Sequence, residues 1–175
     1  PQANSLGGAL AEAAFLTGVE RNADVVVLAS YAPLFARVGY AQWSPDMIWF
    51  DDSDVYLTPN YYVQKLFANH RGTYTIPLQK QDVKLRKEGI YVSAAVDAHG
   101  EIILKLVNTN HREYALMLED ADGLAVRTTG QMWTLRGTGE MPEDRPEVSV
   151  VTEETAEIDG CVFIPAQSLV VIRYQ

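Results

Sequence analysis

The side chains best suited to bind a ligand lie in one expected loop, residues 30–57. Its sequence Trp43-Ser-Pro-Asp46 offers an indole ring that can cover the C–H face of a sugar, and a carboxylate that accepts hydrogen bonds from hydroxyl groups. The alternative is that Trp43 packs the loop and Asp46 caps a short turn. Ser30 and Tyr31, at the start of the loop, either contact the same ligand or only shape the exit of the chain.

The other reactive side chains form no metal or nucleophile site that we recognise. The acidic run Asp51-Asp52-Ser-Asp54 has the oxygen ligands that Ca²⁺ prefers, but it lacks the glycine and terminal glutamate of a calcium loop, which favours a solvated turn. His70, His99 and His111 are scattered at no zinc-ligand spacing. Cys161 lies in an apolar run, as a buried inert thiol would. We therefore predict no metal ion and no cofactor.

Composition argues against two classes of partner. Of the 175 residues, 47% are hydrophobic and 21% are charged, which is typical of a globular protein. The formal net charge of -9 repels nucleic acids and anionic lipid surfaces. The apolar runs are far shorter than the ~20 residues that span a bilayer. We expect no nucleic-acid partner and no membrane.

Two helices and one buried strand are expected in the first half. Residues 5–21 are mostly helix formers with apolar side chains on one face, and Asn4 is available as the N-cap. The continuous β-branched run of residues 24–29 is typical of a parallel strand buried on both faces. Thr58-Pro59 supplies a cap and a first-turn proline for a second helix that ends near Asn69.

The expected strand poses a physical problem. A parallel strand needs hydrogen-bonded neighbours on both edges, and no other stretch of residues 1–71 resembles one. Either the neighbours lie on chain that precedes Pro1, or this piece rearranges and covers the edge by self-association. The chain also begins without a methionine. We therefore expect the first half to be part of a larger unit.

Beyond Gly72 the pattern changes to short runs of β-forming residues at intervals of about ten. Turn sequences such as Ala98-His-Gly100 and Asp159-Gly160 separate many of them. The expected strands are residues 74–78, 90–96, 102–107, 114–118, 132–135, 148–151, 161–164 and 169–174. This pattern predicts an antiparallel β-sandwich of about eight strands.

Several stretches resemble the carboxy-terminal part of glycoside hydrolase family 51, the α-L-arabinofuranosidases. In the first half these are Ser5-Leu-Gly-Gly-Ala-Leu-Ala-Glu-Ala-Ala14, Glu20-Arg-Asn-Ala-Asp24, Ala29-Ser-Tyr-Ala-Pro-Leu-Phe35, Trp43-Ser-Pro-Asp-Met-Ile48 and Tyr61-Tyr-Val-Gln-Lys-Leu-Phe67. In the second half they are Lys105-Leu-Val-Asn-Thr109 and Ile164-Pro-Ala-Gln-Ser-Leu-Val-Val-Ile172. The resemblance covers the whole chain, with the stretches in the family's order.

The resemblance implies an α+β fragment in two parts. Residues 1–71 would be the last βα units of a TIM (β/α)8 barrel, with the run 24–29 as the eighth strand. Residues 72–175 would be an all-β sandwich of jelly-roll type. Barrel enzymes build their sites at the carboxyl ends of the strands, so the loop that begins at Ser30 would face the substrate.

The resemblance also implies a reaction. The family removes terminal non-reducing arabinofuranosyl groups from arabinan and arabinoxylan with retention of configuration. It uses two glutamates, one as acid and base and one as nucleophile, with carboxyl groups about 5 Å apart. Both would precede Pro1, and no motif here matches either of them. We predict that this chain holds no catalytic residue, and that Glu12 and Glu20 are solvated or ion-paired on a helix.

Two functions of another class stay open. The sandwich could be a carbohydrate-binding module, which needs an exposed row of aromatic side chains, although its aromatic residues lie in strands where core packing is favoured. It could also be a structural domain that makes the intact enzyme a homo-oligomer. The sequence distinguishes neither the preferred arabinosyl linkage nor a cytoplasmic from a secreted localisation.

Overall fold

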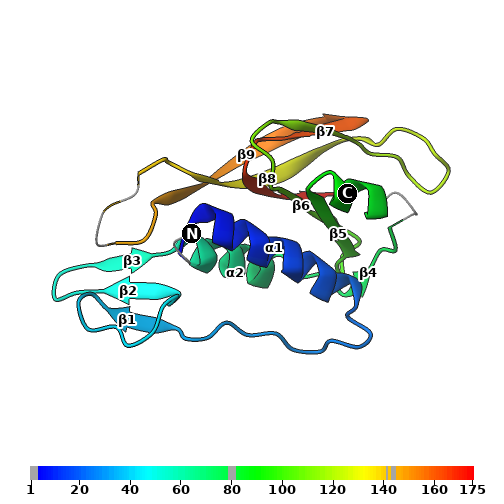
Figure 1. Ribbon diagram of the computed structural model, residues 1–175. Coiled ribbons are helices and arrows are strands. Elements are labelled where there is room, and N and C mark those ends of the chain that lie inside the picture. The colour runs from blue at the N-terminus through cyan, green and yellow to red at the C-terminus, as the bar shows by residue number, and fades with distance from the viewer. Residues whose placement is uncertain (1–3, 79–81, 141, 143–144) are drawn as a thin grey trace.

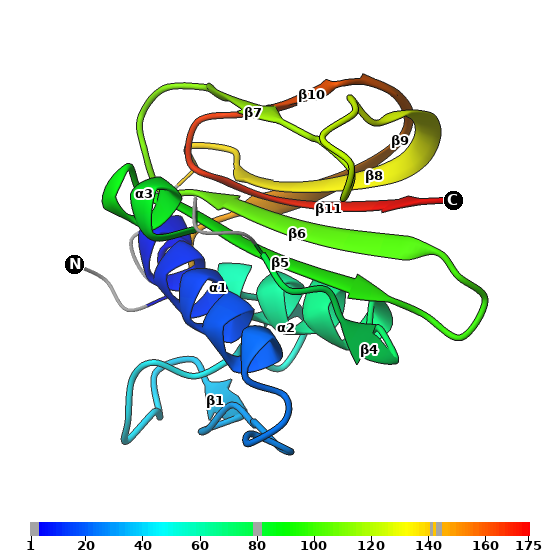
Figure 2. The ribbon, with the colours of Figure 1, turned by 90° about the vertical axis from the view of Figure 1, so that its right-hand side faces the viewer.

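The computed structural model describes residues 4–78, 82–140, 142 and 145–175. Within them most of the helices and strands form three layers, and a small three-stranded sheet lies beyond the helices (Figures 1 and 2). The middle layer is a six-stranded sheet. Helices α1 (Leu6–Arg21) and α2 (Pro59–Asn69) cover one of its faces, and a two-stranded sheet covers the other. No helix in these residues is long and apolar enough to span a bilayer.

Both predicted helices are confirmed. The N-cap of α1 is Ser5, whose hydroxyl accepts a hydrogen bond from the Gly8 N–H at 3.3 Å, so the expectation that Asn4 caps this helix is wrong. Thr58 caps α2 as predicted, accepting from the Tyr61 N–H at 3.2 Å. A short helix, α3 (Asp82–Lys87), was not expected; none of its residues is fully buried, and its six residues are too few for a helical period to stand out.

Residues 24–29, expected as a buried strand, form no strand in this structure. They make a turn and an irregular connection that runs back past the helices (Figure 1). Val25 and Val27 are 75% and 91% exposed. A strand exists only where a neighbour supplies hydrogen bonds, and no strand of the described residues pairs with this run. The barrel units inferred for the first half are therefore not seen in this chain.

The expected loop 30–57 contains a small sheet of its own. β1 (Phe35–Arg37) pairs in parallel with β2 (Ile48–Phe50), and β2 pairs antiparallel with β3 (Val55–Leu57). Figure 1 shows this sheet below the helices, on the side away from the large sheet. Each strand has only three residues, too few for a periodic pattern to predict.

The six-stranded sheet is antiparallel throughout, in the order β4-β5-β6-β11-β8-β9. Its strands are β4 (Tyr74–Thr75), β5 (Ile90–Val96), β6 (Ile102–Asn108), β8 (Arg127–Gly137), β9 (Ser149–Asp159) and β11 (Ser168–Tyr174). The two-stranded sheet joins β7 (Tyr114–Met117) to β10 (Cys161–Ile164). The eight expected strand positions are confirmed. β8 and β9 run well beyond the expected 132–135 and 148–151. The pattern did not predict this extra length, because the added residues are mostly exposed and polar.

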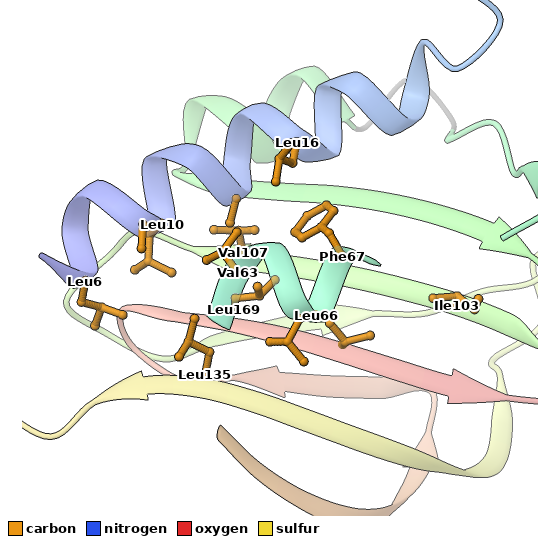
Figure 3. Close-up of a cluster of buried hydrophobic side chains, with 13 residues drawn as sticks. Leu6, Leu10, Leu16, Val63, Leu66, Phe67, Ile103, Val107, Leu135 and Leu169 are labelled. Atoms are coloured by element: carbon orange, nitrogen blue, oxygen red, sulfur yellow. The ribbon is translucent and has the colours of Figure 1, made fainter. Parts of the chain in front are cut away.

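Both faces of the sheet are buried. On β11, Leu169 and Val171 join the cluster beneath the helices, and Val170 and Ile172 join the cluster beneath β7 and β10. Figure 3 shows the first cluster, in which Leu10 and Val63 of the two helices meet the strands. The burial of alternate residues on opposite faces explains why β11 is continuously apolar.

The helix side of the sheet also buries one charge. Lys105 is 1% exposed, and its ammonium group pairs with the Glu20 carboxylate of α1. The Ser93 hydroxyl donates to the same carboxylate at 2.6 Å, and the Phe67 ring lies 5.0 Å from the Lys105 Nζ. The ion-paired role predicted for Glu20 is confirmed, and the pair fixes the end of α1 on the sheet.

The result is an α+β fold with an N-terminal helix and a mostly antiparallel sheet. The boundary predicted between residues 71 and 72 falls between α2 and β4 and stays a prediction. Residues from both sides of it share the helix-side core: Leu10 and Val63 from one side, Leu135 and Leu169 from the other.

Candidate functional site

The candidate site is the long connection between α1 and α2, and Asn4 holds its centre. The Asn4 Nδ2 donates to the Asp46 carbonyl at 2.9 Å, and the Asn4 Oδ1 accepts from the Trp49 Nε1 at 3.2 Å. The Trp49 Nε1 also donates to the Asp46 carbonyl, at 3.1 Å. The residue expected to cap α1 therefore fixes the turn that follows Trp43.

Thr58 holds the far end of the same segment. While its hydroxyl oxygen accepts from the first turn of α2, the hydroxyl proton is donated to the Met47 carbonyl at 2.7 Å. The Thr58 side chain is fully buried. One cap residue thus starts the helix and anchors the loop, so the position of residues 46–49 depends on both α1 and α2.

The four residues proposed as ligand contacts differ in exposure. Trp43 is 67% exposed, Ser30 is exposed and Tyr31 is half-buried, whereas Asp46 is only 3% exposed. Tyr31 and Asp46 come together beside Asn4. No hydrogen bond in the described part of the chain joins Ser30 or Trp43 to that pair. Asp46 cannot reach a sugar in this arrangement unless the loop moves, and its predicted role as a substrate contact stays untested.

The pKa values of Tyr31 and Asp46 are both raised, by burial and, for Tyr31, also by neighbouring negative charge. Burial raises the pKa of Tyr31, the charge of Glu12 raises it further, a hydrogen bond with Asn4 opposes this, and the Asp46 charge adds a smaller increase. Burial also raises the pKa of Asp46. The site therefore favours the neutral forms of its acids.

Glu12 of α1 faces α2. Its carboxylate accepts hydrogen bonds from Asn60 Nδ2 and Gln64 Nε2, both at 2.5 Å. Burial raises the pKa of Glu12, and the two hydrogen bonds counteract the rise. The expected solvated or ion-paired role is wrong for this residue, since it binds two neutral amides. The spacing of Asn60 and Gln64, one helical turn apart, was the signal that could have indicated a polar partner.

The acidic run forms the turn between β2 and β3. The Asp51 Oδ1 accepts from the backbone N–H groups of Ser53 and Asp54, and the Asp51 Oδ2 accepts from the Tyr56 hydroxyl at 2.6 Å. The Tyr56 hydrogen bond and the backbone donors hold the pKa of Asp51 well below its usual range. Asp52 pairs with Arg37 at 2.6 Å. In the described ranges no three His, Cys, Asp or Glu side chains gather as metal ligands.

A polar depression lies at the start of α1. It has a volume of about 250 Å³, and its lining residues are Leu6, His111, Arg136, Gly137, Ala166 and Gln167. None of these lining residues is Phe, Tyr or Trp, and the neighbouring Glu147 carboxylate is engaged by the Leu6 backbone N–H at 2.6 Å. Of the aromatic residues in the expected sandwich, Tyr91, Tyr114, Trp133 and Tyr174 pack against the clusters, while Tyr74 and Phe163 are exposed. They do not form the exposed row that a carbohydrate-binding surface needs.

The side chains in the connection between α1 and α2 are suited to bind a ligand rather than to cleave a bond. Trp43 offers an exposed ring and Ser30 an exposed hydroxyl, both suited to a sugar. The carboxyl of Glu12 is engaged by two amides, and that of Asp46 is covered. Neither carboxyl is placed as an accessible acid or nucleophile.

Comparison with known proteins gives consistent matches. The family model described as the α-L-arabinofuranosidase C-terminal domain matches residues 1–167. Alpha-L-arabinofuranosidase 1 of Arabidopsis thaliana is 35% identical over 173 residues, which cover 94% of this chain and 26% of the plant protein. An extracellular exo-α-L-arabinofuranosidase of Streptomyces chartreusis is 54% identical over 76 residues, covering 43% of this chain and 9% of that protein.

A solved structure matches almost the whole fold. The arabinose-bound MgGH51 α-L-arabinofuranosidase superposes with a TM-score of 0.82 and 28% sequence identity. The match covers 98% of this chain and 28% of the solved chain. The chain thus spans about a quarter of the length of these two longer proteins.

Proposed function

Because the chain belongs to the C-terminal domain of the family 51 α-L-arabinofuranosidases, we propose that it is the end of a longer retaining glycosidase. That enzyme would hydrolyse terminal non-reducing arabinofuranosyl residues of arabinan and arabinoxylan. In this proposal the chain completes the catalytic barrel and supports it, and both catalytic glutamates lie before residue 1. The arabinose in the MgGH51 structure supports an arabinoside as substrate.

The exposed apolar run carries the proposal. Val25, Val27 and Leu28 are 75%, 91% and 83% exposed, and Val26 is 37% exposed. Water-exposed runs of this kind are costly for a protein on its own and mark surfaces that another element covers. Strands of a barrel that begins upstream would cover it on both edges and both faces. The same strand would then deliver Ser30 and Tyr31 to the substrate side of the barrel.

The exposed ring of Trp43 supports a contact with the sugar. Within the proposed enzyme it would stack on the arabinofuranosyl ring or on the neighbouring unit of the polymer, while Asn4 and Thr58 keep its loop in place. Such a contact affects binding more than bond cleavage, because the indole N–H of Trp43 is too weakly acidic to serve as a general acid or base.

Hydrolysis of 4-nitrophenyl α-L-arabinofuranoside tests the assignment. We expect turnover by the longer protein and none by residues 1–175 alone. Because the enzyme retains configuration, the α anomer of arabinose should be the first product in the proton NMR spectrum. Turnover by the purified 175-residue chain that a substitution within it abolishes would overturn the proposed division of roles. A longer protein that hydrolyses other glycosides but not arabinosides would overturn the substrate.

A further inference from the structure

An exposed tyrosine in the connection between α1 and α2 is held by a charged side chain. Tyr40 is 75% exposed, and the guanidinium carbon of Arg37 lies 5.1 Å from the centre of its ring. The Arg37 Nη2 in turn donates to the Asp52 Oδ1 at 2.6 Å. Because Arg37 covers one face of the ring, most of the exposed area lies on the other face and the edges. A side chain held in this way loses little freedom when a ligand binds.

The backbone fixes the same pair. Arg37 ends β1, and its carbonyl accepts from the Tyr40 N–H at 3.0 Å, which closes a four-residue turn. The third residue of this turn, Gly39, has a φ of 77°, a conformation that disfavours other side chains. Asp52 follows β2, which runs parallel to β1 with Phe50 opposite Arg37. The carboxyl ends of the two parallel strands therefore bring Tyr40, Arg37 and Asp52 to one edge of the small sheet.

This group lies close to Trp43 along the chain. Both Tyr40 and Trp43 belong to the segment that joins β1 to β2, and both rings are mostly exposed. Only two residues separate them, so their Cα atoms are at most about 11 Å apart. One oligosaccharide is long enough to contact both side chains. The position of Tyr40 therefore suits a sugar unit next to the one that Trp43 contacts.

The charges of the group favour a neutral ligand. Asp52 balances the charge of Arg37, and the chain carries a formal net charge of -9, so there is no excess positive charge for a polyanion. The open ring face can contact C–H groups, and the guanidinium and carboxylate can form hydrogen bonds with hydroxyl groups. The Arg37 and Asp52 side chains are 46% and 89% exposed, so both are accessible. This combination suits an uncharged sugar.

We propose that Tyr40, held by Arg37 and Asp52, binds a neutral glycosyl unit of the polysaccharide on the leaving-group side of the cleaved bond. This inference rests on the proposed function, which takes the substrate to be a polymer of neutral sugars. Because the arabinosyl residue that is removed is terminal, every other unit of the polymer lies on the leaving-group side. The contact adds to that of Trp43, and it makes the enzyme favour polymeric over short arabinosides.

The test compares a polymeric with a short substrate, using the longer protein. Tyr40→Ala should lower kcat/KM for arabinan roughly 5–20-fold, mainly through KM, because the apolar contact of the ring is lost. For methyl α-L-arabinofuranoside, which has no further sugar unit, kcat/KM should stay within about 2-fold. Tyr40→Phe keeps the ring and should retain most of the activity on arabinan.

Tyr74→Ala is the matched control. It removes a tyrosine that is 71% exposed on β4, at the opposite end of the molecule from β1 in Figure 1. This variant should hydrolyse both substrates at the wild-type rate, because Tyr74 is remote from the connection.

Three results would overturn the inference. The first is an unchanged kcat/KM of Tyr40→Ala on arabinan, and the second is an equal loss on both substrates, which would indicate a role in the fold. The third is an equal loss for Tyr40→Phe and Tyr40→Ala, which would exclude stacking on the ring. The proposed function fails differently, with a wild-type protein that hydrolyses neither substrate. Calorimetric titration with arabinan then tests the site alone: weaker binding by Tyr40→Ala supports it, and equal binding or none overturns it.

Discussion

At the residue scale, an ion pair between Glu20 and Lys105 joins the helices to the sheet. Lys105 is fully buried on β6, and Glu20 reaches it from the last turn of α1. Burial lowers the pKa of Lys105, and the Glu20 charge and hydrogen bond raise it again. The lysine therefore depends on its partner to stay charged.

Replacing Glu20 tests this dependence. Glu20→Gln leaves a buried ammonium group unpaired and should lower the free energy of unfolding by about 3–5 kcal/mol in urea. Lys84→Ala, which breaks an exposed pair with Glu88, is the control and should change it by no more than about 0.5 kcal/mol. The double variant Glu20→Gln/Lys105→Met should recover most of the loss. Equal losses for Glu20→Gln and the control would refute the role of the pair.

His70 gives the fold an acid-sensitive point. Its ring lies 4.1 Å from that of Trp133, and its Nδ1 has no partner. Burial, and then the charges of Arg173 and Lys105, lower the pKa of His70 from 6.5 to about 4, against a small opposing effect of Glu153. The unfolded chain binds the proton first, so this contribution to stability is complete above pH 6.5 and is lost as the pH falls toward 4.

A neutral replacement should remove part of that pH dependence. We expect the midpoint of thermal unfolding of His70→Gln to fall less than that of the wild type between pH 6.5 and pH 4, by an amount equivalent to roughly 1–3 kcal/mol. Differential scanning calorimetry across this range measures it. Parallel curves for the two proteins would show that His70 does not titrate as described.

Residue-level contacts were the least predictable from sequence. Glu20 was expected to be solvated or ion-paired, but its partner is 85 positions away, and no local pattern marks Lys105 as buried. Asn4 looked like a cap because of its type, yet Ser5 takes that place and Asn4 binds the loop. The partner of each side chain depends on which elements pack together in the fold, and a local sequence pattern does not predict this packing.

At the element scale, the sequence predicted what local periodicity controls. Both long helices and the positions of the strands followed from their apolar patterns, whereas β9 was expected to end at Val151 because its later residues are polar on an exposed sheet edge. The run 24–29 was expected as a strand from composition alone, and it lacks the neighbours that make one.

The α2 cap is the element contact that is simplest to test. Thr58→Ala removes both the acceptor for the Tyr61 N–H and the donor to the Met47 carbonyl. We expect a loss of about 1–2 kcal/mol in the free energy of unfolding. Thr58→Ser keeps the hydroxyl and should retain most of the stability. If alanine and serine behave alike in urea unfolding, the hydroxyl does not hold the loop.

At the scale of the whole molecule, a packed part is distinct from an open one. The six-stranded sheet is covered on both faces, by the helices and by β7 with β10. The connection beneath the helices carries the exposed apolar run of residues 25–28. In the proposed enzyme this run meets the upstream barrel.

Amide hydrogen exchange of residues 25–29 in the longer protein tests that central claim most directly. If the run is a barrel strand, its N–H groups are hydrogen-bonded, and mass spectrometry should show exchange slowed at least ~100-fold relative to an unstructured peptide. Exchange at the rate of an exposed loop, as this chain's structure alone would give, would contradict the claim that the chain completes a barrel.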